Sequence, residues 1–300
     1  MNVLDSAIAA VVPRLPQSVV GRVSRKYIAG ETLDSALDAT RALNQCGMSV
    51  TLDVLGENID SAGQADPTVK TYRDALSEMD SRSLDGNISI KLTHLGLRVD
   101  RAACEANARA IVADAHRRGI FVRVDMEDSG TTDATLEVFR ELRSEFSGVG
   151  IVLQSALRRS EADARALAAE GARVRVCKGI YREPKAIAFQ DATEIRHSFL
   201  RLVDILLGHG CHVAIATHDD ELVEKSGHLL EERGGCDGSY EYQMLLGVRE
   251  DLRRDLVAAG HPMRVYVPFG QDWYAYSIRR LKENPRIAGH IARAMLRRRG

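Results

Sequence analysis

The sequence predicts an α/β fold in which eight parallel strands close into a barrel surrounded by helices. Short apolar runs rich in β-branched residues alternate with longer segments of helical periodicity, which is typical of β/α units and a parallel sheet. The alternation occurs eight times in 300 residues, and both the number of repeats and the length match a single barrel domain. The expected strands span residues 48–54, 87–92, 121–125, 149–154, 173–178, 212–217, 239–243 and 264–267.

The segments between these runs predict helices. Residues 101–118 and 161–170 are rich in Ala, Leu, Glu and Arg, which are good helix formers. Residues 3–12 predict an amphipathic first helix that ends at Pro13. We therefore expect an N-terminal helical segment over residues 1–40 that packs on a barrel domain over residues 41–300. The polar, glycine-containing residues 56–68 predict a loop, either mobile over the barrel mouth or a plain connection.

The composition argues against several classes of protein. The 41 Lys and Arg residues balance 42 Asp and Glu residues, so no net field attracts nucleic acid, and we expect no nucleic-acid partner. The sequence has no run of about 18 apolar residues that could span a bilayer. The five cysteines are scattered and lack C-x-x-C spacing, which favours reduced thiols and a cytoplasmic protein.

Common motifs for nucleotides, metals and acyl transfer are missing. Neither G-x-G-x-x-G after a strand nor G-x-x-x-x-G-K-[ST] occurs, so a nucleotide cofactor would not be held by a Rossmann turn or a P-loop. There is no H-E-x-x-H, and His218 has no second histidine at helical spacing, so we expect no metal site. A G-x-S-x-G elbow is missing as well, which weakens a hydrolase interpretation.

Nearly every expected strand ends in side chains that can take part in chemistry. Because the carboxyl ends of the strands in a β/α barrel meet at one face, these residues should surround a single site. The alternative is that each strand simply ends in polar residues where it reaches water. This alternative explains one or two polar strand ends well, but it does not explain charged or polar side chains at nearly every strand end. The residues are Asp53, Glu57, Lys91, Thr93, Asp125, Glu127, Gln154, Arg175, Lys178, Thr217, His218, Glu241, Gln243 and Tyr266.

A helix is expected over residues 272–284, directly after the last strand, with Asp272 as its N-cap. Helical spacing places Tyr276, Arg279 and Arg280 on one face. Two neighbouring guanidinium groups favour an anion between them, and Arg suits a bidentate carboxylate. The pattern predicts a small acidic substrate, with a solvated amphipathic helix that carries surplus charge as an equally open alternative.

Eight segments of the chain together resemble the proline dehydrogenase family. They follow the order and spacing of the family over nearly all of the chain after about residue 40. A chance match could imitate one motif, whereas eight in succession are specific. The segments are VLGE (54–57), SIKLTHLGL (89–97), VRVDMEDS (122–129), GIVLQSALRRS (150–160), RVCKGIYREP (175–184), VAIATHD (213–219), YEYQMLLGVR (240–249) and RVYVPFGQDWYAYSIRRLKENP (264–285).

The resemblance implies a distorted (βα)8 TIM-like barrel whose last helix lies over the carboxyl-end mouth, with FAD bound noncovalently there. The implied reaction oxidises L-proline to Δ1-pyrroline-5-carboxylate by hydride transfer from proline C5 to flavin N5, after which a membrane quinone takes the electrons. Peripheral contact with the inner face of the cell membrane would suit this acceptor. The basic residues Arg293, Arg297, Arg298 and Arg299 are candidates for this contact, with a solvated tail as the alternative and the more usual case. The oligomeric state stays open.

The resemblance also implies roles for individual residues. Arg279 and Arg280 are expected to bind the substrate carboxylate together with Lys91, and Glu57 to pair with Arg279. Asp125 is expected to organise the charges near Lys91, with a purely structural buried ion pair as the alternative. Arg175 is expected to lie near flavin N5 and tune its potential. The residues expected around the pyrrolidine ring are Tyr181, Leu245, Tyr266 and Tyr276, and those expected to hold FAD are Glu127, Gln154, Arg175, Lys178, Thr217 and His218.

Two positions depart from the family pattern. Ala156 stands where the family usually has Tyr, so an aromatic ring is missing from the expected flavin pocket. Ile180 stands where Ala is common, which enlarges the side chain against the flavin. Neither position belongs to the expected carboxylate-binding residues.

Three other functions remain as alternatives. A hydroxyproline dehydrogenase would share the fold, the flavin and the carboxylate site, although relatives that prefer hydroxyproline tend to carry a small residue in place of Tyr266. A barrel aldolase would use Lys91 or Lys178 as a Schiff-base nucleophile with a lowered pKa. A barrel that only binds a partner is the weakest alternative, because it has no use for charged strand ends.

Overall fold

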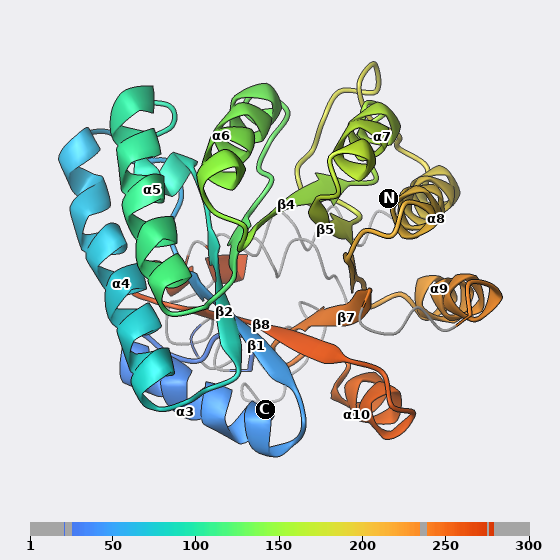
Figure 1. The fold of residues 1–300 in the computed structure, drawn as a ribbon, viewed down its shortest axis with the longest axis horizontal. Coiled ribbons are helices and arrows are strands. Elements are labelled where there is room, and N and C mark those ends of the chain that lie inside the picture. The colour runs from blue at the N-terminus through green and yellow to red at the C-terminus, as the bar shows by residue number, and fades with distance from the viewer. Residues whose placement is uncertain (1–20, 22–25, 235–238, 275, 279–300) are drawn as a thin grey trace, which may run out of the picture.

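The chain forms a closed barrel of eight parallel strands in a computed structural model, which describes residues 21, 26–234, 239–274 and 276–278 (Figure 1). The strand order follows the sequence, and β8 pairs with β1 to close the barrel. The predicted fold class is therefore confirmed, and each strand begins and ends within two residues of its expected bounds. The strands are β1 (Ser49–Val54), β2 (Gly86–Ile90), β3 (Val122–Val124), β4 (Val149–Gln154), β5 (Arg173–Cys177), β6 (Val213–Ala216), β7 (Tyr240–Leu245) and β8 (Met263–Phe269).

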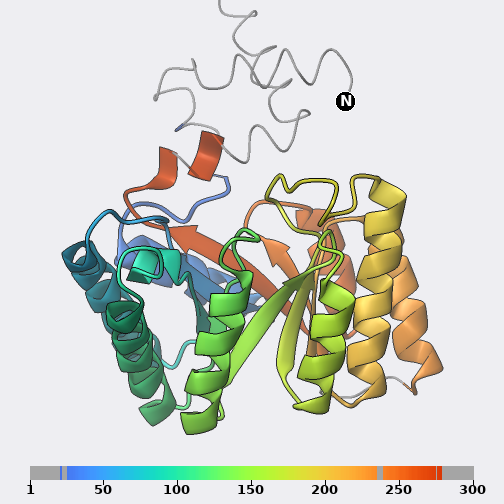
Figure 2. The same ribbon diagram turned by 90° about the horizontal axis from the view of Figure 1, so that it is seen from above.

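Helices connect the strands and form an outer layer around the barrel (Figures 1 and 2). The expected helices over residues 101–118 and 161–170 are confirmed as α5 and α7. No helix in the described ranges is long and apolar enough to cross a membrane. The helices are α3 (Leu33–Gln45), α4 (Asp66–Ser81), α5 (Arg101–Arg117), α6 (Thr132–Glu145), α7 (Ser160–Ala169), α8 (Ala192–Gly208), α9 (Asp220–Glu232) and α10 (Glu250–Ala258), with short 3-10 helices η2 (Ala62–Ala65) and η3 (Thr93–Leu95).

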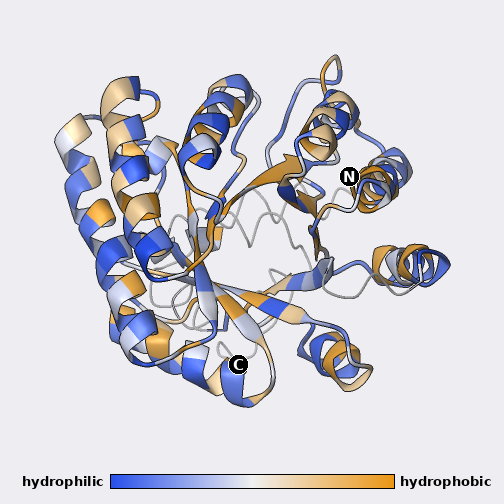
Figure 3. Cartoon of the chain, viewed as in Figure 1, coloured by the Kyte–Doolittle hydropathy of each residue, from blue (hydrophilic) through white to orange (hydrophobic). Residues whose placement is uncertain are grey.

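Side chains alternate along the strands between the helices and the inside of the barrel. On β1, Val50 and Leu52 are fully buried in the core that packs against the helices. Between them, Thr51 points inward, and its hydroxyl donates to Asn87 Oδ1 of β2 at 2.6 Å. Figure 3 shows the matching pattern on α9, whose hydrophobic residues face the barrel. Apolar outer faces therefore hold the helices, which leaves the inner faces for polar residues.

A buried arginine fills the amino end of the barrel. Arg123 is 1% exposed, and its guanidinium donates to the carbonyl oxygens of Ile151 at 2.9 Å and Arg173 at 2.7 Å. The guanidinium carbons of Arg123 and Arg173 lie 4.8 and 4.5 Å from the centre of the Phe121 ring. Gly150 leaves room for this arrangement, because a Cβ at that position would lie 2.5 Å from Phe121 and 2.6 Å from Arg123.

The segment expected to be a polar loop, residues 56–68, is helical in its second half. The 3-10 helix η2 leads directly into α4, and Pro67 stands in the first turn of α4, where a missing N–H costs no hydrogen bond. Ala65 is fully buried and Thr68 is 6% exposed, so this end of the segment packs on the barrel. The prediction of a loop was therefore wrong for residues 62–68, since it overlooked proline as a helix start.

The expected N-terminal segment, residues 1–40, lies mostly outside the described residues, and so does the predicted helix over residues 3–12. Its described part includes the start of α3, which continues past residue 40 to Gln45. This helix packs against β1 and β8. The Thr32 side chain caps α3 by accepting from the Ser35 backbone N–H at 3.3 Å.

Candidate active site

A cavity of about 600 Å³ opens at the carboxyl ends of the strands. Its volume lies in the range that small-molecule sites occupy. Every described residue to which the family resemblance assigned an individual role lines this cavity, whereas Arg279 and Arg280 lie outside the described residues. Of the polar strand ends expected around one site, Thr93 and Glu241 do not line the cavity. Thr93 donates to Glu127, and the Glu241 carboxylate accepts from Arg264 instead. The lining residues with predicted roles are Glu57, Lys91, Asp125, Glu127, Gln154, Arg175, Lys178, Tyr181, Thr217, His218, Leu245, Tyr266 and Tyr276.

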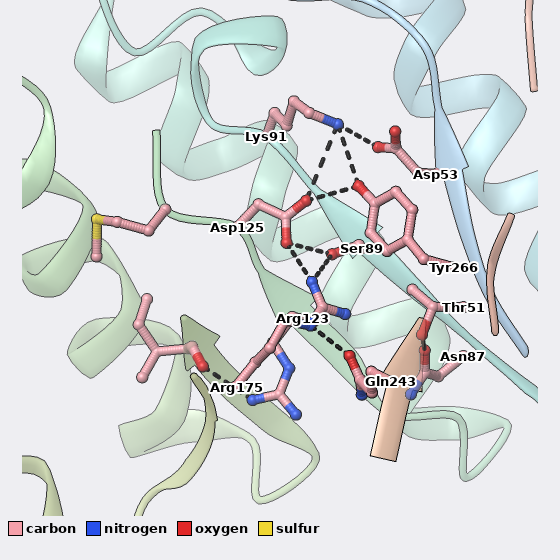
Figure 4. Close-up of polar contacts among 12 residues, drawn as sticks. Thr51, Asp53, Asn87, Ser89, Lys91, Arg123, Asp125, Arg175, Gln243 and Tyr266 are labelled. Atoms are coloured by element: carbon pink, nitrogen blue, oxygen red, sulfur yellow. Dashed lines mark hydrogen bonds and ion pairs between the residues drawn. The ribbon is translucent and has the colours of Figure 1, made fainter. Parts of the chain in front are cut away.

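Asp125 follows β3 and is the centre of a hydrogen-bond network at the bottom of this cavity (Figure 4). Its Oδ1 accepts from the Ser89 hydroxyl at 2.6 Å and from the Arg175 guanidinium at 2.7 Å. Its Oδ2 accepts from the Tyr266 hydroxyl at 2.8 Å. Burial alone would raise the pKa of Asp125, but the positive charges of Arg175 and Lys91 hold it below its ordinary value. Asp125 is therefore a carboxylate that accepts hydrogen bonds at neutral pH.

Lys91 follows β2 and lies between two carboxylates. Its ammonium donates to Asp53 Oδ1 in a short hydrogen bond and lies 3.9 Å from Asp125 Oδ2 and 3.4 Å from the Tyr266 hydroxyl. Burial alone would lower the pKa of Lys91, but the charges of Asp53 and Asp125 outweigh burial and raise it. Lys91 is thus a fixed cation at the bottom of the cavity.

Arg175 of β5 is a second cation that lines the cavity. Its Nε donates to Gln243 Oε1 at 2.6 Å, and its guanidinium carbon lies 5.3 Å from the centre of the Tyr266 ring. Within the described part of the chain, Arg175 Nη2 has no hydrogen-bond partner, although it is buried. A buried guanidinium with an unused donor at a cavity wall is suited to bind a polar ligand atom.

Tyr266 of β8 completes the central network. Burial, together with the negative charge of Asp125, raises the pKa of the Tyr266 hydroxyl well above its ordinary value. The hydroxyl therefore stays protonated and donates to Asp125. Its ring forms one wall of the cavity.

Glu127 and Gln154 were predicted to hold the cofactor, and the structure shows what each contacts. Both Glu127 carboxylate oxygens accept from Thr93, one from its backbone N–H at 3.0 Å and the other from its hydroxyl in a short hydrogen bond. The Gln154 amide nitrogen donates to the carbonyl oxygens of Met126 and Glu127, each at 3.0 Å. Glu127 therefore anchors the turn after Lys91, while Gln154 presents its amide oxygen as an acceptor on the cavity wall.

Charged and polar residues of β5 and β6 form the rim of the cavity. The Lys178 ammonium and the Arg196 Nε both donate to Asp219 Oδ2, the latter at 2.7 Å. Thr217 accepts from the Asp219 backbone N–H at 3.2 Å, and His218 Nε2 accepts from the Leu245 backbone N–H at 2.9 Å. His218 therefore joins the ends of β6 and β7 and fixes this part of the rim.

An apolar wall faces the charged floor. Leu245, Tyr181 and Tyr276 line the cavity, and Tyr276 is 6% exposed in a small cluster with Ile28 and Leu55. Trp273 packs against this cluster. A pocket with one apolar wall and a charged floor suits a small molecule that has both characters.

The loop after β1 carries Glu57 to the cavity. Gly56, with φ 148°, lies over the buried His94 ring, where a Cβ would approach to 2.1 Å. Glycine is therefore required immediately before Glu57. The predicted pairing of Glu57 with Arg279 involves a residue outside the described ranges.

Asp53 is the main site residue for which the sequence analysis predicted no role. It was recognised as one of the polar strand ends, but its partner Lys91 is 38 positions away in the sequence. The signal was its position on the same inward face as Thr51. Among the described residues, no group of three or more His, Cys, Asp or Glu side chains is placed to bind a metal ion.

Comparisons with known proteins point in the same direction as the geometry. A family model described as proline dehydrogenase matches residues 36–293. Proline dehydrogenase from Deinococcus radiodurans is 36% identical over 300 residues, which cover 98% of this chain and 97% of that protein. Proline dehydrogenase 2 from Bacillus subtilis is 35% identical over 260 residues, covering 87% of this chain and 86% of that protein.

A solved structure with a proline-utilization name shares the barrel fold of this chain. The crystal structure of proline utilization A from Bdellovibrio bacteriovorus, inactivated by N-propargylglycine, aligns with a TM-score of 0.83 and 25% identity. The match covers 88% of this chain and 33% of that longer chain. The barrel therefore corresponds to one part of a larger protein in that relative.

Proposed function

The chain belongs to the proline dehydrogenase family and is an oxidoreductase that acts on the CH–NH group of proline; we propose that its barrel cavity is where this chemistry takes place. FAD is the cofactor of this family, and it supplies a hydride acceptor, flavin N5, for the hydrogen on proline C5. The product of this oxidation is Δ1-pyrroline-5-carboxylate. A quinone is the proposed final acceptor of the electrons.

The observation that carries this proposal is the pairing of fixed cations with an apolar wall in one cavity. Lys91 supplies a positive charge for the substrate carboxylate, and Leu245 and Tyr276 supply apolar contacts for the pyrrolidine ring. Arg279 and Arg280 are proposed to complete the carboxylate site from the last helix, with Glu57 as the partner of Arg279. Tyr181 and Tyr266 would close the pocket around the ring.

The residues present also suit FAD. Arg175 offers the buried donor without a described partner, which can hydrogen-bond to the flavin and place positive charge beside it. Gln154 offers an acceptor, and Lys178, Thr217 and His218 form a polar rim for the rest of the nucleotide. Glu127 would act indirectly through Thr93. Ala156 is not among the residues that line the cavity, although its Cβ lies 3.5 Å from the position that a Cβ would take on the cavity-lining Gly179.

The alternatives are less consistent with this site. A Schiff-base aldolase needs a lysine with a lowered pKa, whereas the pKa of Lys91 is raised by its two carboxylate neighbours. A hydroxyproline dehydrogenase needs space for the ring hydroxyl, and the Tyr266 ring occupies part of the wall. Proline is therefore the preferred substrate.

The cellular context follows from the chemistry of the acceptor. We propose a cytoplasmic protein that meets the inner face of the cell membrane peripherally, because a quinone acceptor is dissolved in the bilayer. The basic residues proposed for this contact, Arg293 and Arg297–Arg299, lie outside the described ranges. The division into an N-terminal segment over residues 1–40 and a catalytic barrel over 41–300 is likewise proposed.

An anaerobic visible spectrum tests this function. The purified protein should be yellow, and adding L-proline without oxygen should bleach the flavin absorbance. Lys91→Met should keep the flavin colour but need much more proline for the same bleaching, because one of the cations proposed to bind the substrate carboxylate is lost. A colourless preparation, or a yellow one that proline leaves unchanged, would contradict the proposal.

A further inference from the structure

Asp53 has an unusual position for a charged side chain. It is fully buried at the carboxyl end of β1, and its side chain is 1% exposed. Its carboxylate accepts from the Lys91 ammonium, which reaches it from β2 (Figure 4). A buried charge is costly unless it is paired, so the two side chains constrain each other.

Charged groups from several elements face Lys91. From β1 and the loop after it come Asp53 and Glu57, and from β3 comes Asp125. His94 of η3 and Tyr266 of β8 also lie close to the ammonium. The Arg175 guanidinium is one step further away, bound to Asp125 Oδ1. Asp53 is the carboxylate that makes the direct hydrogen bond, whereas Asp125 lies 3.9 Å away and has three other donors.

We propose that Asp53 is a positioning residue for substrate binding, which holds the Lys91 ammonium in the cavity and prevents it from collapsing onto Asp125. This inference rests on the proposed function, because it assigns Lys91 to the substrate carboxylate. Without the Asp53 carboxylate, the ammonium would move toward Asp125 and shorten its present 3.9 Å contact with Asp125 Oδ2 to a direct hydrogen bond. The ammonium would then be displaced from the position at which the substrate carboxylate is proposed to bind.

Binding of a proline analogue separates this role from a general structural role. Tetrahydro-2-furoate is the probe, and the change that it causes in the flavin spectrum of the yellow holoenzyme reports its dissociation constant. Asp53→Asn keeps the shape of the side chain and removes the charge, so the dissociation constant should rise about tenfold. The alkaline limit of binding should also move to lower pH, because the Lys91 ammonium has lost its nearest counter-charge.

A double variant, compared with the single variant Lys91→Met, tests whether Asp53 acts through Lys91. If Asp53 acts only through Lys91, the double variant Asp53→Asn/Lys91→Met should bind the analogue as weakly as Lys91→Met alone. The double variant removes both members of a buried pair and should therefore fold even if Asp53→Asn alone does not. A double variant that binds more weakly than Lys91→Met would overturn the proposal.

A matched control lies on the same strand. Thr51→Val also alters a buried polar side chain of β1, but Thr51 bonds to Asn87 and not to Lys91. The dissociation constant of the analogue and the alkaline limit of its binding should be the same for Thr51→Val as for the wild type. If Thr51→Val shifted them as much as Asp53→Asn does, the effect of Asp53→Asn would be merely structural. If the wild type itself fails to bind the analogue, the proposed function fails; if it binds and Asp53→Asn binds equally well, only the role of Asp53 fails.

Discussion

The Tyr266 hydroxyl donates to Asp125 Oδ2 at 2.8 Å, across the barrel from β8 to the end of β3. This bond holds the Tyr266 hydroxyl in place, because Arg175 and Ser89 hold the other oxygen of the carboxylate, Oδ1. The ring therefore forms a rigid part of the cavity wall. We propose that its size and position limit which ring substituents the substrate can carry.

Replacing Tyr266 with serine should change substrate preference. The smaller side chain opens space for a ring hydroxyl and keeps a hydroxyl of its own. The ratio of kcat/KM for trans-4-hydroxy-L-proline to kcat/KM for L-proline should rise about tenfold or more. Tyr266→Phe is the control, since it keeps the ring and should leave the ratio near the wild-type value. An unchanged ratio in Tyr266→Ser would remove Tyr266 from the pocket assignment.

Much of the fold and of the cavity could be predicted because strands alternate their side chains. On β1, an apolar outer face and the polar Thr51 and Asp53 are visible in the sequence, and parallel strands bring such ends to one face. Individual partners could not be predicted in this way. The hydrogen bond between Asp53 and Lys91 depends on the lateral register of β1 and β2, which pairs Asp53 with Ser89.

Other features followed no local pattern. No motif in the sequence marked Arg123, whose burial is possible because carbonyl oxygens of neighbouring strands accept hydrogen bonds from its guanidinium. The helical turn η2 was missed because glycine and polar residues suggested a loop. The assignment of Arg279 and Arg280 to the substrate carboxylate stays a prediction.

The amino end of the barrel should be sensitive to one methyl group. In Gly150→Ala, the new Cβ would lie within 2.6 Å of Phe121 and the Arg123 guanidinium, so the packed rings and guanidinium groups must shift. We expect the free energy of unfolding to fall by about 1–3 kcal/mol, measured by urea denaturation followed by circular dichroism.

Gly63→Ala is the matched control for this prediction. Gly63 has no atom within 4 Å of its Cβ position, and its free energy of unfolding should change by less than about 0.5 kcal/mol. Equal effects of the two substitutions would show that the Phe121 cluster does not constrain position 150.

The positive charge of Arg175 should raise the reduction potential of the bound flavin. A cation beside the flavin favours the electron-rich reduced form, so Arg175→Gln should lower the midpoint potential by about 30 mV or more, equivalent to roughly 1.4 kcal/mol for two electrons. Arg175→Lys keeps the charge and should recover most of the wild-type potential. Spectroelectrochemical titration measures both, and equal potentials in the wild type and Arg175→Gln would place the charge too far from the flavin to matter.

The stability of the protein should fall in mildly acidic solution, in part because of His212 at the amino end of the barrel. Burial lowers the pKa of His212 to about 4, and the cations Arg173 and Arg123 add to this effect. An unfolded histidine has a pKa of about 6.5, so between pH 4 and 6.5 the unfolded chain binds more protons than the folded one. Stability should therefore decrease as the pH falls through this window, by up to about 1.4 kcal/mol per pH unit for each such histidine.

Substituting His212 with glutamine should remove one of these contributions. The plot of unfolding free energy against pH, obtained from urea denaturation at several pH values, should become less steep between pH 4 and 6.5 by up to about 1.4 kcal/mol per unit. Part of the slope should persist, because burial also lowers the pKa of His94 to about 4. If His212→Gln and the wild type had the same slope, His212 would titrate alike in the folded and unfolded chains, and another group would have to account for the acid sensitivity.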